Sequence, residues 1–157
     1  MNQTVTIIRA NPLSPEAAAL LAAHAKHGSA SAPQDSDHTL DPAGLAGADI
    51  RFYLLYQSGQ ALGCGALKSL SDGTSEVKSV HVAASARGLG FAGRIMQHLE
   101  AEARAAGATA LVLETGSPLC PGYDAARRLY EKLGFEYCGP LPGYQEDPMS
   151  VFMRRGL

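Results

Sequence analysis

Residues 85–96 read SARGLGFAGRIM, a glycine-rich turn that leads into a stretch of helical periodicity. One interpretation takes the G-x-G-x-x-G pattern that begins at Gly88 as a dinucleotide-binding turn. A second interpretation takes the R-x-x-G-x-A pattern that begins at Arg87 as a different phosphate-binding loop. Both place an anion at the N-terminus of the following helix, where free amides and the helix dipole favour negative charge. The elements on either side decide between them.

Upstream of this turn, the sequence predicts a strand, a helix and an antiparallel meander. The β-branched run at 4–10 predicts the first strand. Ser14, Pro15 and Glu16 are typical of a helix start, and Gly28 is expected to end that helix. Residues 29–49 are rich in small and polar types and predict a long loop, with a short helical turn from Asp41. The three strands of the meander are expected at 50–57, 61–70 and 75–83.

Downstream of the turn, helices and strands alternate. The apolar spacing predicts helices at 90–106 and 123–133, with an apolar central strand at 110–115 between them. Two further strands are expected at 135–139 and 150–155. A meander followed by this alternation predicts an α+β fold: a mixed, mostly antiparallel sheet of about six to seven strands with helices on both faces.

The composition indicates one ordinary globular domain spanning 1–157. The chain is 46% hydrophobic and 18% charged, with a formal net charge of −2. No basic patch favours nucleic acid, and the pair Arg127-Arg128 is expected to be a solvated helix face. No apolar run approaches the roughly 18 residues of a membrane span, and the N-terminus resembles no secretory signal. The sequence therefore predicts a cytoplasmic protein without membrane contact.

The cysteines and histidines point to no metal or redox site. Cys64, Cys120 and Cys138 are odd in number and form no C-x-x-C pair, so they are expected to be reduced thiols. The histidines show no metal-ligand spacing, and the prediction is no metal.

The dinucleotide interpretation has one point in its favour. Glu114 follows Gly93 by 21 residues, near the distance at which a ribose-binding acid is expected. However, AASAR separates the apolar strand from the first glycine, and only 43 residues follow Glu114, too few for the second half of a dinucleotide fold. The missing Gly-Lys-Ser/Thr excludes a P-loop. A nicotinamide enzyme is therefore the third choice.

The second interpretation coincides with a family resemblance. The stretch EVKSVHVAASARGLGFAGRIMQHLEAEARAAGATALVLET, residues 76–115, resembles the core of the GCN5-related N-acetyltransferases, the GNAT family. The family signature Q/R-x-x-G-x-G/A is met by Arg87, Gly90 and Ala92. AARRLYEKLGF, residues 125–135, is similar to the family's later helix and strand. The resemblance implies acetyl-CoA as donor, bound where two parallel central strands splay apart.

The resemblance also implies how acetyl-CoA is held. Its pyrophosphate would lie on the amides of residues 88–93, and its pantetheine arm would add to the strand that ends at residues 80–82. At Tyr123 many members have an asparagine, so the cofactor contact there is a departure from the pattern. The expected cofactor-binding residues are Val80, His81, Val82, Arg87, Gly88, Leu89, Gly90, Phe91, Ala92, Gly93 and Tyr123.

The catalytic residues implied by the resemblance are Tyr130 and Glu76. Tyr130 matches the tyrosine that protonates the CoA thiolate, and a backbone N–H near Val82 would polarise the carbonyl. Glu76 is a candidate base for the amine, with His81 and His38 as alternatives. An aromatic on a helical stripe is more often a core residue, and a strand acid is often structural.

The acceptor is expected to be a small-molecule amine or a protein amino group. Its pocket would be built from 28–49, 116–124 and 139–149, whose acidic residues favour a cationic amine. A homodimer is possible. An alternative function is a CoA-binding sensor or partner module without transfer. The candidate substrate contacts are His38, Glu114, Tyr144 and Asp147.

Overall fold

The computed structural model describes residues 4–31 and 42–157. These residues form seven strands, four α-helices and two short 3-10 helices in the described part of the chain. In chain order they are β1 (Val5–Arg9), α1 (Pro15–Ser31), α2 (Pro42–Leu45), β2 (Ile50–Gln57), β3 (Gln60–Ser69), β4 (Ser75–Val82), η2 (Ala84–Ala86), α3 (Phe91–Ala105), β5 (Ala110–Gly116), η3 (Pro121–Tyr123), α4 (Asp124–Lys132), β6 (Glu136–Cys138) and β7 (Ser150–Gly156).

The strands form one sheet in the order β1-β2-β3-β4-β5-β7-β6. Every neighbouring pair is antiparallel except β4 and β5, which are parallel. The predicted mixed sheet is therefore confirmed. A dinucleotide fold would need a mostly parallel sheet, so the nicotinamide interpretation has no support in this topology.

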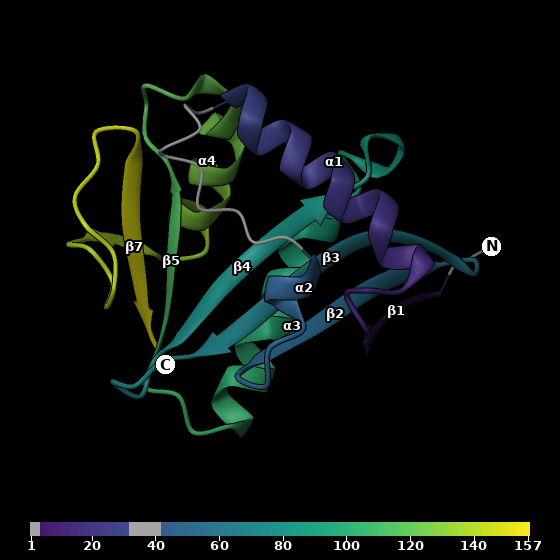
Figure 1. The fold of residues 1–157 in the computed structure, drawn as a ribbon, viewed down its shortest axis with the longest axis horizontal. Coiled ribbons are helices and arrows are strands. Elements are labelled where there is room, and N and C mark those ends of the chain that lie inside the picture. The colour runs from purple at the N-terminus through teal and green to yellow at the C-terminus, as the bar shows by residue number, and fades with distance from the viewer. Residues whose placement is uncertain (1–3, 32–41) are drawn as a thin grey trace.

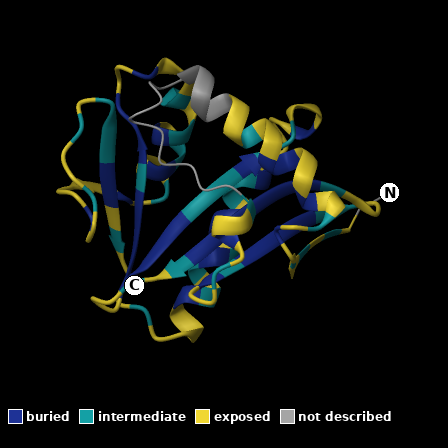
Figure 2. Cartoon of the chain, in the orientation of Figure 1, coloured by how far each residue is buried: buried dark blue, intermediate teal, exposed yellow. Residues whose placement is uncertain are grey.

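Helices cover both faces of the sheet: α1 and α2 lie on one face, and α3 and α4 lie on the other (Figure 1). Leu20 and Phe52 belong to the core beneath α1, and Leu99 and Leu111 belong to the core beneath α3. The central strands are accordingly buried, whereas the outer side of α1 is exposed (Figure 2). Cover on both faces explains why the sequence of β2 is apolar without alternation.

Helix α1 is longer than predicted, because it continues past Gly28 to Ser31. A glycine inside a helix costs only about 1 kcal/mol relative to alanine, and a helix that is already propagating tolerates that cost. The prediction that Gly28 ends the helix was wrong. The other predicted boundaries differ from the observed ones by one residue at most.

The parallel strands β4 and β5 pair only at one end. Their register covers Ser75 with Leu111 and Glu76 with Val112, and no later pair follows. Beyond these residues the strands diverge, and we call the opening between them the splay. Its presence agrees with the splayed central pair that the family resemblance implied.

A bulge in β4 accompanies the splay. The β3–β4 register shifts between Cys64 and Ala66, and Ser79 takes a φ of 56°, in the left-handed region. The Cys64 thiol donates a hydrogen bond to the Ser79 carbonyl at 3.2 Å. Burial raises the pKa of this thiol to about 12, so it stays protonated and keeps donating. The thiol thus supports a backbone geometry that a non-glycine residue adopts only at a cost.

The close approach of β3 to α3 depends on Gly65. A Cβ at this position would lie 2.7 Å from Ile95 Cγ2 and 3.3 Å from Leu99 Cδ1. We expect Gly65→Ala to lower the free energy of unfolding by about 1–3 kcal/mol, because α3 must move away from the sheet. Urea denaturation measures the loss. Gly139→Ala is the control, since a Cβ there meets no atom within 4 Å, and equal midpoints for the two variants would contradict the prediction.

Candidate active site

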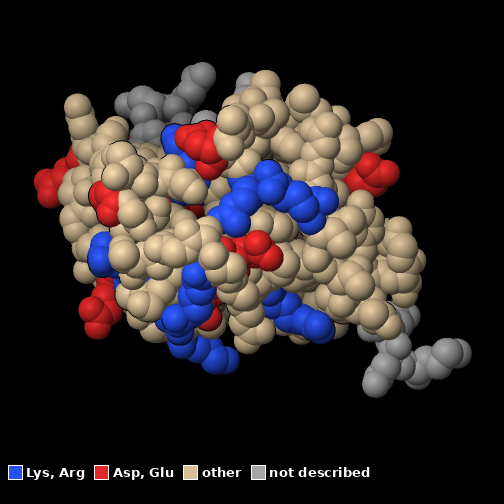
Figure 3. All heavy atoms as spheres, turned by 90° about the horizontal axis from the view of Figure 1, so that it is seen from below, with Lys and Arg blue, Asp and Glu red and all other residues tan. Residues whose placement is uncertain are grey.

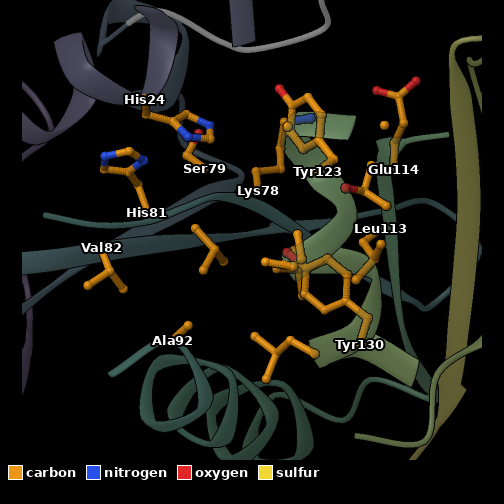
Figure 4. Close-up of a pocket in the computed structure, with 18 of the residues that line it drawn as sticks. His24, Lys78, Ser79, His81, Val82, Ala92, Leu113, Glu114, Tyr123 and Tyr130 are labelled. Carbon is orange, nitrogen blue, oxygen red and sulfur yellow. The ribbon is translucent and has the colours of Figure 1, made fainter. Parts of the chain in front are cut away.

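A pocket of about 380 Å³ lies in the splay between β4 and β5 (Figure 4). Tyr130 enters it from α4, Leu113 and Glu114 from β5, and His24 from α1. The remaining lining residues are Glu76, Val77, Lys78, Ser79, Val80, His81, Val82, Arg87, Ala92, Thr115, Gly116, Gly122, Tyr123, Ala125, Ala126, Leu129, Met149 and Ser150. The structure therefore brings β4, the loop before α3, and α4 to one place.

The loop before α3 leaves its backbone open to an anion. Gly88 and Gly90 have φ values of 81° and 79°, which favour glycine, and Gly90 is the residue before the first turn of α3. A Cβ at Gly88, Gly90 or Gly93 would meet no atom within 4 Å, so open space lies before these residues. The amides of the first helical turn have no partner within the helix and are available there.

The side chains of this loop take different directions. Arg87 and Ala92 line the pocket. Leu89 is 59% exposed, whereas Phe91 is buried in the core beneath α3. Any contact of Phe91 with a bound anion would therefore be made by its backbone amide. Its ring packs in the core and holds the start of α3 in place.

The end of β4 presents its two sides to different layers. Val80 and Val82 pack against the core beneath α3. His81 points the other way, as the strand alternation predicts, and its ring stands edge-to-face with that of His24 at 5.4 Å between centroids. All four residues line the pocket. The imidazoles therefore lie on the α1 side of the splay.

Tyr130 is buried and projects into the pocket from the α3 side of the sheet. Its ring packs edge-to-face on Phe135 at 5.8 Å, while its hydroxyl makes no hydrogen bond to residues 4–31 or 42–157. Burial, with a smaller contribution from Tyr123, raises the pKa of Tyr130 to about 12. The hydroxyl is therefore a protonated donor across the neutral range. Tyr130 therefore belongs both to the hydrophobic core and to the lining of the pocket.

Glu76 and Lys78 lie two residues apart on β4, on the same face, and join Tyr144 in a buried cluster. Lys78 Nζ donates to Glu76 Oε2 at 3.0 Å and to the Tyr144 hydroxyl oxygen at 2.9 Å. The Tyr144 hydroxyl in turn donates to Glu76 Oε2 at 2.7 Å. Burial, the hydrogen bond to Glu76 and the charges of Glu76 and Glu114 all raise the pKa of Tyr144. The Glu76–Lys78 ion pair is therefore buried, with side chains 3% and 9% exposed.

The end of β5 and the start of α4 form the upper side of the pocket. Glu114 and Tyr123 both line it. The Tyr123 ring lies directly over Gly116, where a Cβ would be 2.7 Å from Tyr123 Cγ. Tyr123 thus takes a place at the pocket that depends on a glycine in β5.

Two predicted acceptor contacts are not placed at the pocket. His38 lies outside the described residues. Asp147 is not a lining residue of the pocket, and its Oδ1 accepts a hydrogen bond from the Met149 amide at 2.9 Å. Tyr144 is not a lining residue either, but it contacts the lining residues Glu76 and Lys78.

The sequence analysis missed three functional or supporting residues. Lys78 could have been found from its strand spacing to Glu76, because alternate residues share a face. His24 offered no signal, since nothing local brings α1 over β4. Arg127 was expected to be solvated and is instead buried.

Arg127 ties α4 to the end of β5. Its guanidinium donates to the Gly116 carbonyl at 2.5 Å and to the Ser117 carbonyl at 2.7 Å, and it pairs with Asp124. The adjacent Arg128 is exposed. Because α4 carries Tyr130, this contact fixes the distance between the tyrosine and β5.

The described residues meet the requirements of neither a three-ligand metal site nor a membrane-spanning helix. Acidic and basic side chains are interspersed on the face drawn in Figure 3. Among residues 4–31 and 42–157, no three His, Cys, Asp or Glu side chains gather as metal ligands. In the same ranges, no helix combines the length and the apolarity that a membrane crossing requires.

Comparison with known proteins defines an N-acetyltransferase class. An IAA acetyltransferase of Azospirillum brasilense is 41% identical over 155 residues, 98% of each chain, and the uncharacterized N-acetyltransferase YsnE of Bacillus subtilis is 42% identical over 125 residues, 80% of this chain and 82% of that one. A solved candidate acyl-CoA N-acyltransferase from Klebsiella pneumoniae is 30% identical, covers 99% of both chains and superposes with a TM-score of 0.80.

The acetyltransferase (GNAT) family matches residues 18–135, and the chain belongs to that family. It is an acyltransferase of the GNAT type, as the resemblance at residues 76–115 and 125–135 implied. The family uses acetyl-CoA and acts on amines.

Loss of the Arg127 guanidinium should loosen the end of β5. We expect Arg127→Met to lower the free energy of unfolding by about 3 kcal/mol, because two backbone carbonyls lose their buried donor. Arg128→Met is the matched control and should change stability by less than about 0.5 kcal/mol, as an exposed substitution does. Thermal unfolding monitored by circular dichroism compares them; the same midpoint for both variants would contradict the structural role of Arg127.

Proposed function

We propose that this protein transfers the acetyl group of acetyl-CoA directly to an amine within a ternary complex. The amine nitrogen bonds to the acetyl carbon as the carbon–sulfur bond breaks. The proton lost by the amine goes to a base, and Tyr130 supplies a proton to the departing sulfur. The observation that carries the proposal is the position of Tyr130: a buried, protonated hydroxyl without a described hydrogen-bond partner, in a pocket that opens between β4 and β5.

The loop before α3 supports the binding of the donor. Open space lies at the Cβ positions of Gly88, Gly90 and Gly93, and the first turn of α3 carries the positive end of the helix dipole, which suits a pyrophosphate. Arg87 adds a cation at the same place. Residues 80–82 are not paired with β5, and we propose that an extended pantetheine arm pairs along this edge of β4. A backbone amide near Val82 would then lie beside the thioester carbonyl.

Glu76 is the proposed base. Its Oε2 is occupied by Lys78 and Tyr144, which leaves Oε1 to accept a proton from the amine or through a water molecule. His81 lines the same side of the pocket and stays the alternative. Comparison of Glu76→Gln with His81→Gln distinguishes them, since only loss of the base removes the acidic limb from the pH profile of kcat/KM.

Replacement of Tyr130 tests the acid. We expect Tyr130→Phe to lower kcat by about 10²- to 10⁴-fold, the usual contribution of a general acid, while acetyl-CoA still binds. Release of free thiol is followed with acetyl-CoA and a panel of amines. The control is Tyr137→Phe, because Tyr137 is exposed on β6 and donates its hydroxyl hydrogen bond to Glu131, away from the pocket lining.

The binding-module alternative makes the opposite prediction. If the protein is a CoA sensor or partner module, CoA binds tightly, no amine of the panel releases thiol, and Tyr130→Phe has no effect. That result would overturn the proposal.

The pH dependence follows from the pKa of Tyr130. Because this pKa is raised to about 12, the neutral phenol is present below it and is lost only as the pH rises through it. We therefore expect no fall in kcat from loss of this proton between about pH 7 and 10, where an ordinary tyrosine begins to ionise. An alkaline limb near pH 9 that vanishes in Tyr130→Phe would contradict the assignment.

A further inference from the structure

The side chain of Lys78 is only 9% exposed, yet one of its three ammonium protons has no hydrogen-bond partner in the described part of the chain. Two protons are donated, to Glu76 Oε2 and to the Tyr144 hydroxyl. Within residues 4–31 and 42–157 no acceptor serves the third. Lys78 also lines the pocket, where Figure 4 shows it between Ser79 and Tyr123. A nearly buried ammonium with a spare donor in a pocket indicates a ligand that accepts a hydrogen bond.

Glu76 offers the complementary group. Its side chain is 3% exposed, and both of its described hydrogen bonds end on Oε2. Oε1 receives none from the described residues, and it is not among the fully buried atoms that lack a partner, so it keeps access to the pocket. Glu76 and Lys78 therefore present a spare acceptor and a spare donor side by side, with their paired atoms 3.0 Å apart.

We propose that the acceptor amine is that of a free α-amino acid, with its amino group on Glu76 Oε1 and its carboxylate on Lys78 Nζ. An α-amino acid carries a donor and an anionic acceptor joined through one carbon, which matches this adjacent pair. A lysine side chain of a protein and a protein N-terminus lack the carboxylate, because the backbone uses it as an amide. The proposal rests on the proposed acetyl transfer and concerns the groups that all α-amino acids share.

The test compares matched acceptors. Each natural amino acid is assayed with acetyl-CoA beside its decarboxylated amine and its α-amide, which keep the amino group and remove the negative charge. We expect kcat/KM to be at least about tenfold higher for the amino acid, equivalent to about 1.4 kcal/mol. Glu114 also lines the pocket; its attraction for the amino group is common to all members of a set, and its repulsion of a carboxylate acts against the expected preference.

Lys78→Met should bring the ratio of kcat/KM for the amino acid to kcat/KM for its decarboxylated amine close to one. Lys78→Arg should retain part of the preference for the amino acid. The matched control is Lys68→Met: Lys68 lies opposite Glu76 on β3 and is not a lining residue of the pocket, so its loss should leave the ratio unchanged. Acetyl-CoA binding and the melting temperature report whether each variant folds. If Lys78→Met does not fold, Lys78→Gln takes its place.

The outcomes separate this inference from the proposed function. Equal rates for acids, amides and decarboxylated amines, or a Lys78 variant that lowers all three alike, would overturn the inference and leave acetyl transfer standing. Turnover of amines but of no free amino acid would overturn it too. Failure of every acceptor, together with the absence of any effect of Tyr130→Phe, would count against both.

Discussion

The end of the β4–β5 pairing at Glu76 and Val112 is the constraint on which the rest of the structure depends. A continuous parallel ladder would close the sheet and leave no room for a ligand between the strands. Instead the bulge at Ser79 redirects β4, and the Cys64 thiol holds that redirected backbone. Beyond the bulge, strand alternation turns Val80 and Val82 toward α3 and His81 toward α1. A small local irregularity therefore creates a passage through the sheet.

The two sides of this passage have different chemistry. On the α3 side are the open amides of residues 88–93 and the hydroxyl of Tyr130, which suit an anionic donor and its leaving sulfur. On the α1 side are charged and imidazole groups, among them Lys78 and His81, which suit a polar acceptor. Donor and acceptor would thus approach from opposite faces of the sheet and meet in the splay. The proposed direct attack within a ternary complex fits this arrangement, because the amine and the thioester would meet without a residue that carries the acetyl group.

Most of the fold follows from local patterns. Helix and strand periodicities located the strands and the α-helices, but not the short 3-10 helices η2 and η3. The turn at residues 87–92 was informative because glycine conformation and the helix N-terminus are local properties. The prediction that α1 ends at Gly28 was wrong, because helix propagation and packing on the sheet outweigh the small free-energy cost of one glycine within the helix. Membership of the family could also be predicted, since each of its two motifs lies within one short continuous stretch of sequence.

The acceptor side could not be predicted in the same way. The contact of Tyr144 with Glu76 joins residues 68 positions apart, and the approach of His24 to His81 depends on how α1 crosses the sheet. Arg127 was misjudged because an arginine in a helix pattern is usually solvated, whereas here two carbonyls at the end of β5 require a donor. Such contacts depend on the assembled fold.

A crystal structure of the protein with CoA tests the central claim most directly. The account predicts the pyrophosphate on the amides of residues 88–93, the pantetheine arm paired with residues 80–82 in the splay, and the Tyr130 hydroxyl within hydrogen-bond distance of the sulfur. A CoA molecule bound elsewhere, or a sulfur out of reach of Tyr130, would contradict it.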